Sequence, residues 1–496
     1  MYVGSNNRAC HILWLAFFPI VWGSFFKELF PLFGGYTDAR FLLAFALLTA
    51  PILFILKVPG VRVLPLTGWL LFCGSGVVSL LADPFVTSSS WVEAIYYPAF
   101  LVSVAGIAYV LKECRYPAFF VPVYGLVGGM MLYAFKTPAE YLFAISDDVS
   151  RIDKFLPWGF VNIRYWSHLT SWLLPLLPLA VLAGPWRDNR LWRFGVAVTA
   201  GIWWWLIILS TARGSFVSIL VGGTIVLLLF GKHAKPWLSV LFRQIGIGVA
   251  FWVLLSVLIP WMFLADIELR GVGMDGSGRM RLWSEAWAMS LVNFPFGMGP
   301  QSWLTHEVIT PAYETGKRLG HPHNMYLMWA AEYGWLAVFG LILIGVEGVR
   351  RVWNVRREIA LFSLQFEQTQ LMIALVASVI AAFFHAGASA VFLAPASMLV
   401  GLVVLAVFWA VISHSQFGSG FSGPRDFGRL TWGRALVALM AFMSLLFWNL
   451  EVVRYYKAMR LDQSWYAENV RQPFYPRFWY HGYYPRHPDL MPTRNE

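Results

Sequence analysis

Residues 279–299 read RMRLWSEAWAMSLVNFPFGMG, and residues 321–327 read HPHNMYL. Both stretches lie in a polar island that runs from Ala265 to Asn324, whereas most of the remaining sequence is apolar. A membrane protein rarely gathers so much Arg, His, Gly and Trp in one loop unless that loop has a chemical task. We therefore interpret the island as the functional loop and the apolar segments as its membrane-embedded frame.

The composition places the chain among polytopic membrane proteins. Of its 496 residues, 58% are hydrophobic and only 13% are charged, which is far from the soluble average. The net charge of +11 does not indicate nucleic-acid binding, because the basic residues fall in short loops between apolar segments, as the positive-inside bias requires. The cysteines at 10, 73 and 114 are isolated and indicate neither a disulfide framework nor a zinc site.

The apolar segments predict an all-α polytopic membrane fold with twelve or thirteen transmembrane helices, since about 20 apolar residues cross a bilayer. The candidate spans are 11–33, 40–57, 64–82, 91–111, 117–134, 165–183, 193–210, 214–231, 241–264, 324–346, 371–388, 390–413 and 434–450. The predicted regions are the N-terminal helices 1–264, a long helical loop 265–323 between spans nine and ten, the C-terminal helices 324–450 and an aromatic, basic tail 451–496.

The loop charges predict the orientation in the membrane. Basic residues follow every even-numbered span, for example Lys57, Lys112 and Arg350. Cytoplasmic loops carry the excess of Lys and Arg, so the N-terminus is predicted to be cytoplasmic and the 265–323 loop to lie on the outer face. Thirteen spans would put the tail outside and twelve would put it inside, and the sequence leaves both arrangements open.

Two arginines on the outer face suit an anionic ligand. Arg279 lies four residues before Trp283 in a predicted surface helix, so the two side chains share a face. Arg213 lies in a short turn between two apolar spans, on the face where basic residues are disfavoured. A guanidinium binds phosphate through two parallel hydrogen bonds, so Arg213 and Arg279 together suit a pyrophosphate. In the simpler alternative, Arg279 and Arg281 contact lipid phosphates.

Two histidines flank Pro322 at the start of the 324–346 span. A histidine at a helix N-terminus feels the positive end of the helix dipole, which favours the neutral imidazole that a general base needs. No Asp, Glu or Cys stands beside His321 and His323 at ligand spacing, so no metal site is predicted. In the alternative interpretation, His321 caps the helix and His323 lies at the membrane interface.

Two further polar residues stand near the ends of apolar spans. Arg164, beside Asn162, is another outer-face arginine and a further candidate for contact with the anion. His385 lies in the hairpin between two late spans, and we interpret it as a packed polar residue unless the fold brings it to the loop. The sequence contains no P-loop, no dinucleotide-binding fingerprint and no serine nucleophile elbow.

The order of these motifs resembles the signature region of the O-antigen ligase family. The matching elements are Arg279-x-x-x-Trp283, Pro295-Phe-Gly-Met-Gly299, Pro322-His-Asn-x-Tyr-Leu327 and Glu332-x-Gly334. The Ser210-Thr-Ala-Arg-Gly214 turn is similar to the family's Ser/Thr-x-Arg-Gly element. The superfamily comprises O-antigen ligases, O-antigen polymerases and bacterial protein O-oligosaccharyltransferases.

The resemblance implies an inverting, metal-independent glycosyltransferase of the membrane-embedded class C type that needs no cofactor. It implies a location in the bacterial inner membrane with the active site facing the periplasm. The donor would be an undecaprenyl-diphosphate-linked O-antigen, and the ligase branch uses the lipid A-core oligosaccharide as acceptor. In this sequence His323 would be the base, Arg213 and Arg279 would bind the diphosphate, and the further substrate-binding candidates are Arg164, Arg281, His321 and Asn324.

Three alternatives remain open at this point. A polymerase would use the same donor but a second lipid-linked glycan as acceptor. A protein O-oligosaccharyltransferase often carries a large periplasmic C-terminal domain, for which the 451–496 tail is short. A lipid or sugar transporter is disfavoured, because transporters usually show internal symmetry and ionisable residues at the bilayer midplane, whereas here the charges gather at one face and no repeat is visible.

Overall fold

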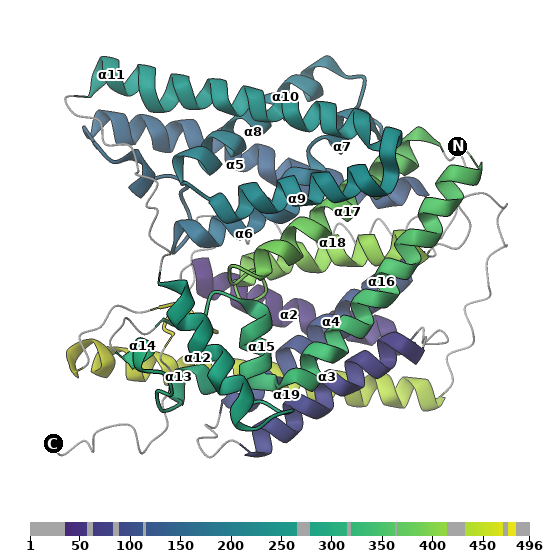
Figure 1. The fold of residues 1–496 in the computed structure, drawn as a ribbon, viewed down its shortest axis with the longest axis vertical. Helices are drawn as coiled ribbons and strands as arrows, with labels where there is room; N and C mark the ends of the chain where they lie inside the picture. The colour runs from purple at the N-terminus through teal and green to yellow at the C-terminus, as the bar shows by residue number, and fades with distance from the viewer. Residues whose placement is uncertain are drawn as a thin grey trace.

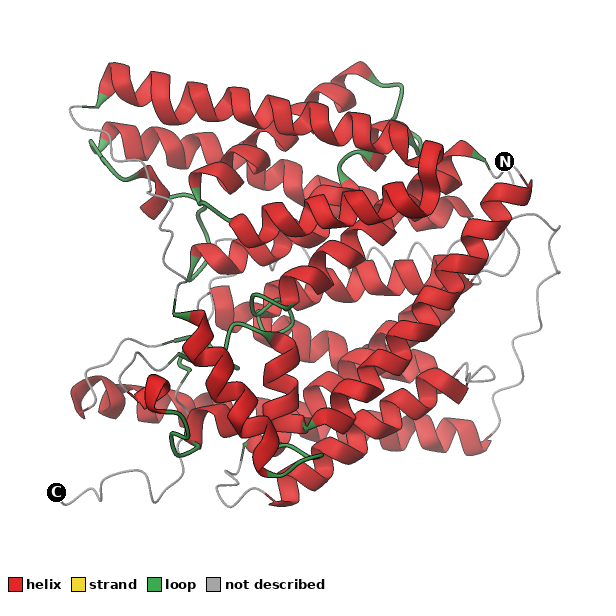
Figure 2. Ribbon diagram, in the orientation of Figure 1, coloured by secondary structure: helices red, strands yellow, loops and turns green. Residues whose placement is uncertain are grey.

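The computed structural model describes residues 35–56, 63–82, 89–112, 116–264, 278–314, 319–362, 365–413, 432–469 and 475–482. Within these ranges the chain forms helices and no strands (Figure 2). The predicted all-α class is therefore confirmed. The predicted span 11–33 and the loop residues 265–277 and 315–318 lie outside the described residues.

The helices follow one another along the chain in the order that Figure 1 labels. Their bounds are α2 (Gly35–Leu56), α3 (Val63–Ala82), α4 (Ser90–Lys112), α5 (Phe120–Ser146), α6 (Ile163–Leu173), α7 (Leu179–Leu182), α8 (Arg190–Leu209), α9 (Arg213–Phe230), α10 (Lys235–Trp252), α11 (Ile259–Phe263), α12 (Arg279–Val292), α13 (Ser302–Thr305), α14 (Pro311–Glu314), α15 (Met325–Tyr333), α16 (Trp335–Phe362), α17 (Phe366–Ala386), α18 (Pro395–Ser413) and α19 (Trp432–Asn469).

Seven helical stretches among the described residues are long and apolar enough to cross a membrane, which makes this a multi-pass membrane protein. One of them, Arg213–Phe263, covers two predicted spans. The chain reverses inside it through the short turn Gly231–Ala234, so that α9 and α10 run in opposite directions (Figure 1). Gly231 allows this reversal because it adopts a φ of +54°, which side-chain-bearing residues rarely take.

The centre of the bundle is formed by α17 and α18, which lie between α8 to α10 on one side and α2, α4 and α19 on the other (Figure 1). Nearly every residue of α18 is buried, as expected for a helix that is apolar all round. α18 packs on α4, α17 packs on α9, and α16 packs on α3.

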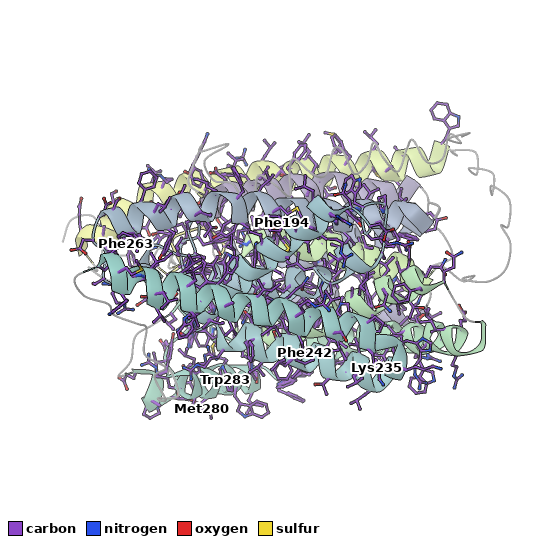
Figure 3. All side chains as sticks on the ribbon, turned by 90° about the horizontal axis from the view of Figure 1, so that it is seen from above. Phe194, Lys235, Phe242, Phe263, Met280 and Trp283 are labelled. Carbon is purple, nitrogen blue, oxygen red and sulfur yellow. The ribbon has the colours of Figure 1, made fainter. Side chains whose placement is uncertain are left out.

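The outer surface of the bundle carries large apolar side chains. Phe194, Phe242, Phe263 and Met280 lie on the outside in Figure 3 and are each more than half exposed. So much exposed apolar surface is unusual for a protein in water. It fits a surface that lipid tails cover.

The prediction of one continuous helix over 324–346 is wrong. The helix breaks at Gly334, which has a φ of +91° and separates α15 from α16. A Cβ atom at Gly334 would lie 2.5 Å from the Cα of Phe296, and one at Gly297 would lie 2.3 Å from the carbonyl carbon of Glu332. The glycines of the two motifs are therefore needed for close backbone packing between the 295–299 turn and the end of α15.

The 295–299 turn also provides hydrogen-bond donors for carbonyl groups at the end of α15. The N–H groups of Met298 and Gly299 donate to the carbonyls of Ala331 and Glu332 at 2.8 and 3.0 Å. A helix leaves its last carbonyls without partners inside the helix, so this docking fixes the position of α15 relative to α12. Figure 1 shows α12 to α15 gathered at one end of the long helices.

The C-terminal residues belong to that same end of the molecule. Helix α19 continues past residue 450 to Asn469, and the segment 475–482 then packs into the core, with Arg477 fully buried. The Arg477 guanidinium donates to the carbonyl of Gly320, directly before His321, at 3.2 Å. Residues 475–482 of the tail therefore lie beside the 319–323 segment.

Candidate active site

Helix α12 confirms the surface helix predicted from Arg279 and Trp283. It packs on α15 through Leu282, Ala286 and Met289, which follow helical spacing and are buried. Trp287 and Leu291 form another apolar row on the helix, but both residues are 50% exposed. The row of Leu282, Ala286 and Met289 faces α15 and packs on it. The row of Trp287 and Leu291 therefore stays on the outside, as in a helix that lies at a membrane interface.

Three arginines from three helices converge at one end of the bundle. Arg164 lies in the first turn of α6, where Asn162 accepts a hydrogen bond from its backbone N–H at 2.9 Å. Arg213 and Arg279 are the first residues of α9 and α12. Burial lowers the pKa of Arg279, and the positive charges of Arg164 and Arg213 lower it further. The three guanidiniums therefore repel one another within one region.

The local backbone adds to this positive potential. In the described part of the chain neither α9 nor α12 has a side chain that caps its N-terminus. A helix N-terminus carries unsatisfied N–H groups and a partial positive charge, and so attracts anions. The Nε of Arg279 is buried and has no hydrogen-bond partner among the described residues. An anion bound among the three arginines would relieve their repulsion and satisfy such donors.

His323 lies beside these arginines in a neutral state. Its side chain is 9% exposed, and its Nδ1 has no hydrogen-bond partner in the described residues. Burial lowers the pKa of His323 to about 3, with contributions from the charges of Arg164 and Arg279. The imidazole is therefore neutral at ordinary pH. The sequence argument expected neutrality from the helix dipole, whereas burial and the two arginines are the main causes here.

The backbone at His323 is strained. Its φ of +56° lies in the left-handed region, which residues other than glycine rarely adopt. Thr211, two residues before Arg213, has a φ of +50°. Such strain persists only where the surrounding structure enforces it, and it gathers at functional sites.

His321 and Asn324 hold the backbone around His323. The Nδ1 of His321 accepts a hydrogen bond from the N–H of His323 at 3.2 Å, so the neutral His321 carries its proton on Nε2. Asn324 caps α15 by accepting from the N–H groups of Tyr326 and Leu327 at 3.0 and 3.1 Å. The alternative in which His321 caps the helix is therefore wrong. Arg281 lies in the first turn of α12, with its Nε beside Gly278.

Two buried histidines of the neighbouring helices lie close by. The Nδ1 of His385 is 2.8 Å from the Ser171 hydroxyl, and its ring lies against Gly214, directly after Arg213. The fold thus brings His385 to the Arg213 turn. His168, which was not predicted from the sequence, has its ring centroid 5.3 Å from that of His385. Its signal was its position four residues after Arg164, on the same face of α6.

A buried carboxylate folds the outer loop onto α12. Glu285 accepts hydrogen bonds from the Nε2 of His306 at 2.9 Å and from the N–H groups of Ile309 and Thr310 at 2.8 Å each. Burial raises the pKa of Glu285, but these hydrogen bonds outweigh the effect and hold it at about 2. The carboxylate is therefore ionised and fixes the 302–314 segment.

Glu285→Gln is expected to loosen the 302–314 segment, because it replaces an ionised acceptor of several hydrogen bonds, a loss of about 1–3 kcal/mol. The depressed pKa means that the stabilisation is present above the unfolded pKa of Glu and lost as the pH falls through about 2. Hydrogen–deuterium exchange of this segment at neutral pH measures the effect. Glu314→Gln, at an exposed position, is the matched control, and equal exchange in the two variants would contradict the prediction.

The motif residue Glu332 is structural. Both of its carboxylate oxygens accept from Nη2 of Arg477, at 2.6 and 2.5 Å. One of them also accepts from the N–H of Trp303 at 3.3 Å. The sequence analysis missed Arg477 as a member of this region, since it lies in the tail, and nothing in its local sequence indicates its partner.

Comparison with known protein families gives an independent observation. A family model described as O-antigen ligase matches residues 176–342. No curated protein matches the chain. The matched region includes Arg213, Arg279, His321 and His323, whereas Arg164 and the tail lie outside it.

The family match agrees with the motif order from which the resemblance was drawn. Members of this family are glycosyltransferase-like membrane enzymes, and the family implies a lipid-linked glycan and a lipid acceptor as substrates. The resemblance is thereby confirmed: over residues 176–342, about a third of the chain, this multi-pass membrane protein is similar to the O-antigen ligase family.

Proposed function

We propose that the protein is an O-antigen ligase of the bacterial inner membrane. It transfers a glycan from undecaprenyl diphosphate to the lipid A-core oligosaccharide at the periplasmic face, in lipopolysaccharide biosynthesis. The observation that carries the proposal is the convergence of Arg164, Arg213 and Arg279 beside the neutral, strained His323. This arrangement combines an anion-binding cluster with a general base.

The proposed reaction is a single displacement at the anomeric carbon of the donor. The acceptor hydroxyl oxygen bonds to that carbon as the bond to the diphosphate oxygen breaks on the opposite face, which inverts the configuration. His323 takes the hydroxyl proton. The diphosphate leaves with the bonding electrons, and the guanidiniums of Arg213 and Arg279 stabilise its growing charge.

The arginine cluster explains why the proposed reaction needs no metal ion. A diphosphate is already a good leaving group, and its added charge needs fixed positive groups in a site that excludes water. Three guanidiniums and two uncapped helix N-termini supply them. We assign diphosphate binding to Arg213 and Arg279, with Arg164 and Arg281 as further contacts to the donor.

The outer surface near the site supports lipid-carried substrates. The exposed side chains of Trp261, Phe263 and Met280 lie on α11 and α12, next to the outer loop. A polyprenyl tail stays in the membrane while its diphosphate reaches the arginines. We therefore place donor entry sideways from the lipid between α9 and α12.

The decisive experiment is glycan transfer by the purified protein in detergent or liposomes with EDTA present. The substrates are an undecaprenyl-diphosphate glycan and rough lipopolysaccharide, and mass spectrometry identifies the product. Glycan on the lipid A-core supports the proposal. Chain growth from the donor alone means a polymerase, glycan on an added acceptor protein means an oligosaccharyltransferase, and failure of all three contradicts glycan transfer.

The pH dependence of the reaction tests the state of His323. Because its pKa is about 3, the base stays neutral at pH 5, whereas an ordinary histidine with a pKa near 6.5 would be protonated. We expect kcat/KM, which reports the free enzyme, to show no fall from His323 between pH 8 and pH 5.

Removing a neighbouring charge should move this profile in a known direction. Arg164→Gln takes away one of the charges that lower the pKa of His323, so the acid limb should shift to higher pH. Folding is checked at each pH by gel filtration. A fall of the wild-type kcat/KM centred near pH 6.5 would contradict the assignment of His323 as a buried neutral base.

A further inference from the structure

The deepest ion cluster of the outer end is built by the C-terminal tail. Arg477 has no exposed surface, and its Nη2 contacts Glu332 of α15 and, at 2.9 Å, Glu93 of α4. Its Nη1 donates to the carbonyl of Gly320 at 3.2 Å. One side chain from the tail therefore joins α4, α15 and the residue directly before His321.

The tail backbone that carries Arg477 is itself held in place. The hydroxyl of Tyr36 donates to the carbonyl of Arg477 at 2.5 Å, and the Nε of Arg40 donates to the carbonyl of Phe478 at 2.7 Å. The guanidinium of Arg40 also lies 4.7 Å from the Phe478 ring centroid. The tail segment is thus held against α2, so the backbone that carries Arg477 is fixed in position.

The segment before His321 fits closely against this tail. A Cβ atom at Gly320 would lie 2.9 Å from the carbonyl oxygen of Pro476 and 3.1 Å from that of Tyr475. Only glycine allows such an approach without movement of the backbone. Gly320 is therefore the point at which the tail and the histidine segment meet.

His323 depends on these backbone anchors. Its φ of +56° is a strained conformation that the surroundings must enforce, and its Nδ1 has no hydrogen-bond partner within the described ranges. The position of the imidazole therefore follows from the backbone on either side. Arg477 holds the upstream side at Gly320 and the downstream side at Glu332 of α15.

We infer that Arg477 is a positioning residue for the proposed base, so that the C-terminal tail is part of the active-site assembly. The inference rests on the proposed function for its effect on rate. The planar guanidinium reaches Gly320, Glu93 and Glu332 together because its nitrogens point in fixed, different directions. A lysine would keep the charge that two buried carboxylates require, but its single nitrogen cannot make all of these contacts.

The test compares two variants that disturb the same contact from opposite sides. Arg477→Lys keeps the positive charge but loses some of the contacts of the guanidinium. Gly320→Ala adds a Cβ that pushes residues 319–323 away from the tail. Each is expected to lower kcat for glycan transfer by about 10²-fold, the cost of misplacing a catalytic group by about 1 Å. The KM for the donor should stay within about twofold, because the diphosphate-binding arginines lie on other helices.

Arg460→Lys is the matched control, because Arg460 is exposed on the tail side of α19 and its guanidinium donates to the nearby Gln463 at 3.1 Å. It should leave kcat and KM unchanged. A parallel rise of KM with the fall of kcat in both variants, or a loss of monodisperse protein in both, would overturn the inference, because it would indicate general loosening of the fold.

A second measurement does not depend on the reaction. Hydrogen–deuterium exchange of residues 319–328 should rise in Arg477→Lys and Gly320→Ala but not in Arg460→Lys. Unchanged exchange would overturn the positioning role. If the wild type transfers no glycan, the proposed function is contradicted. Raised exchange in the two variants would then still support the role of Arg477 in positioning residues 319–323.

Discussion

Replacing His323 with alanine is expected to lower kcat for glycan transfer by about 10²–10⁴-fold, the usual contribution of a general base. The variant cannot accept the proton that the acceptor hydroxyl loses as it attacks. The donor should still bind, because its diphosphate is proposed to contact arginines on α9 and α12. Single-turnover transfer, measured together with donor binding by the purified protein, separates the two effects.

Two other histidines make this test specific. His321→Ala removes the acceptor for the His323 N–H, so it should cost less than His323→Ala, by misplacing the base. His233→Ala, at an exposed position in the turn after α9, should leave kcat unchanged. A larger loss at His321 than at His323 would mean that the base has been assigned to the wrong histidine.

Replacing Arg279 or Arg213 with alanine is expected to lower kcat/KM for the donor by about 10²–10³-fold, as for the loss of one fixed donor to a developing negative charge. The effect should be larger for Arg279, which is partly buried, than for the exposed Arg213, because a less hydrated charge interacts more strongly. Lysine at either position should restore activity only in part, since it cannot form two parallel hydrogen bonds with a phosphate. Initial rates over a range of donor concentrations provide the measurement.

Arg243→Ala is the matched control for the two arginines. Arg243 is exposed on α10, on the face predicted to be cytoplasmic, and its loss should leave kcat/KM within about twofold. Arg279→Ala should also raise the pKa of His323, because one of the positive charges that lower it is gone. Equal activity of Arg279→Ala and the wild type at limiting donor would contradict the diphosphate site.

The sequence predicted the helical class, which the structure confirms, and it indicated the residues of the proposed site, both for physical reasons that act locally. Long apolar segments must form helices in lipid, because a membrane offers backbone groups no other hydrogen-bond partners. Arg213, Arg279 and His323 stood out because charged or titratable side chains beside apolar spans are costly and need a function. The spacing of Arg279 and Trp283 also predicted α12, since a helix repeats every 3.6 residues.

The sequence did not predict the break at Gly334 or the place of His168 beside His385. Hydropathy shows one apolar run over 324–346, and the break depends on the approach of the 295–299 turn to the end of α15. His168 lies within an apolar span, and its place near the site depends on the packing of α6 against α17. Both features depend on which helices become neighbours, and a hydropathy pattern carries no such information.

The sequence by itself determined that the chain forms membrane helices, because long apolar segments must form helices in lipid. It also predicts that the polar island and the Arg213 turn share one face and carry the arginines and histidines of the proposed site. Only the tertiary structure decided that the charges of Arg164 and Arg279 act on His323, that Arg213 acts on Arg279, and that Arg477 of the tail is buried beside the residue before His321. The partners of Arg477 stand 145 and 384 residues away, at Glu332 and Glu93. Contacts over such separations follow from the packing of the whole bundle, because a buried arginine takes whichever carboxylates the fold brings to it.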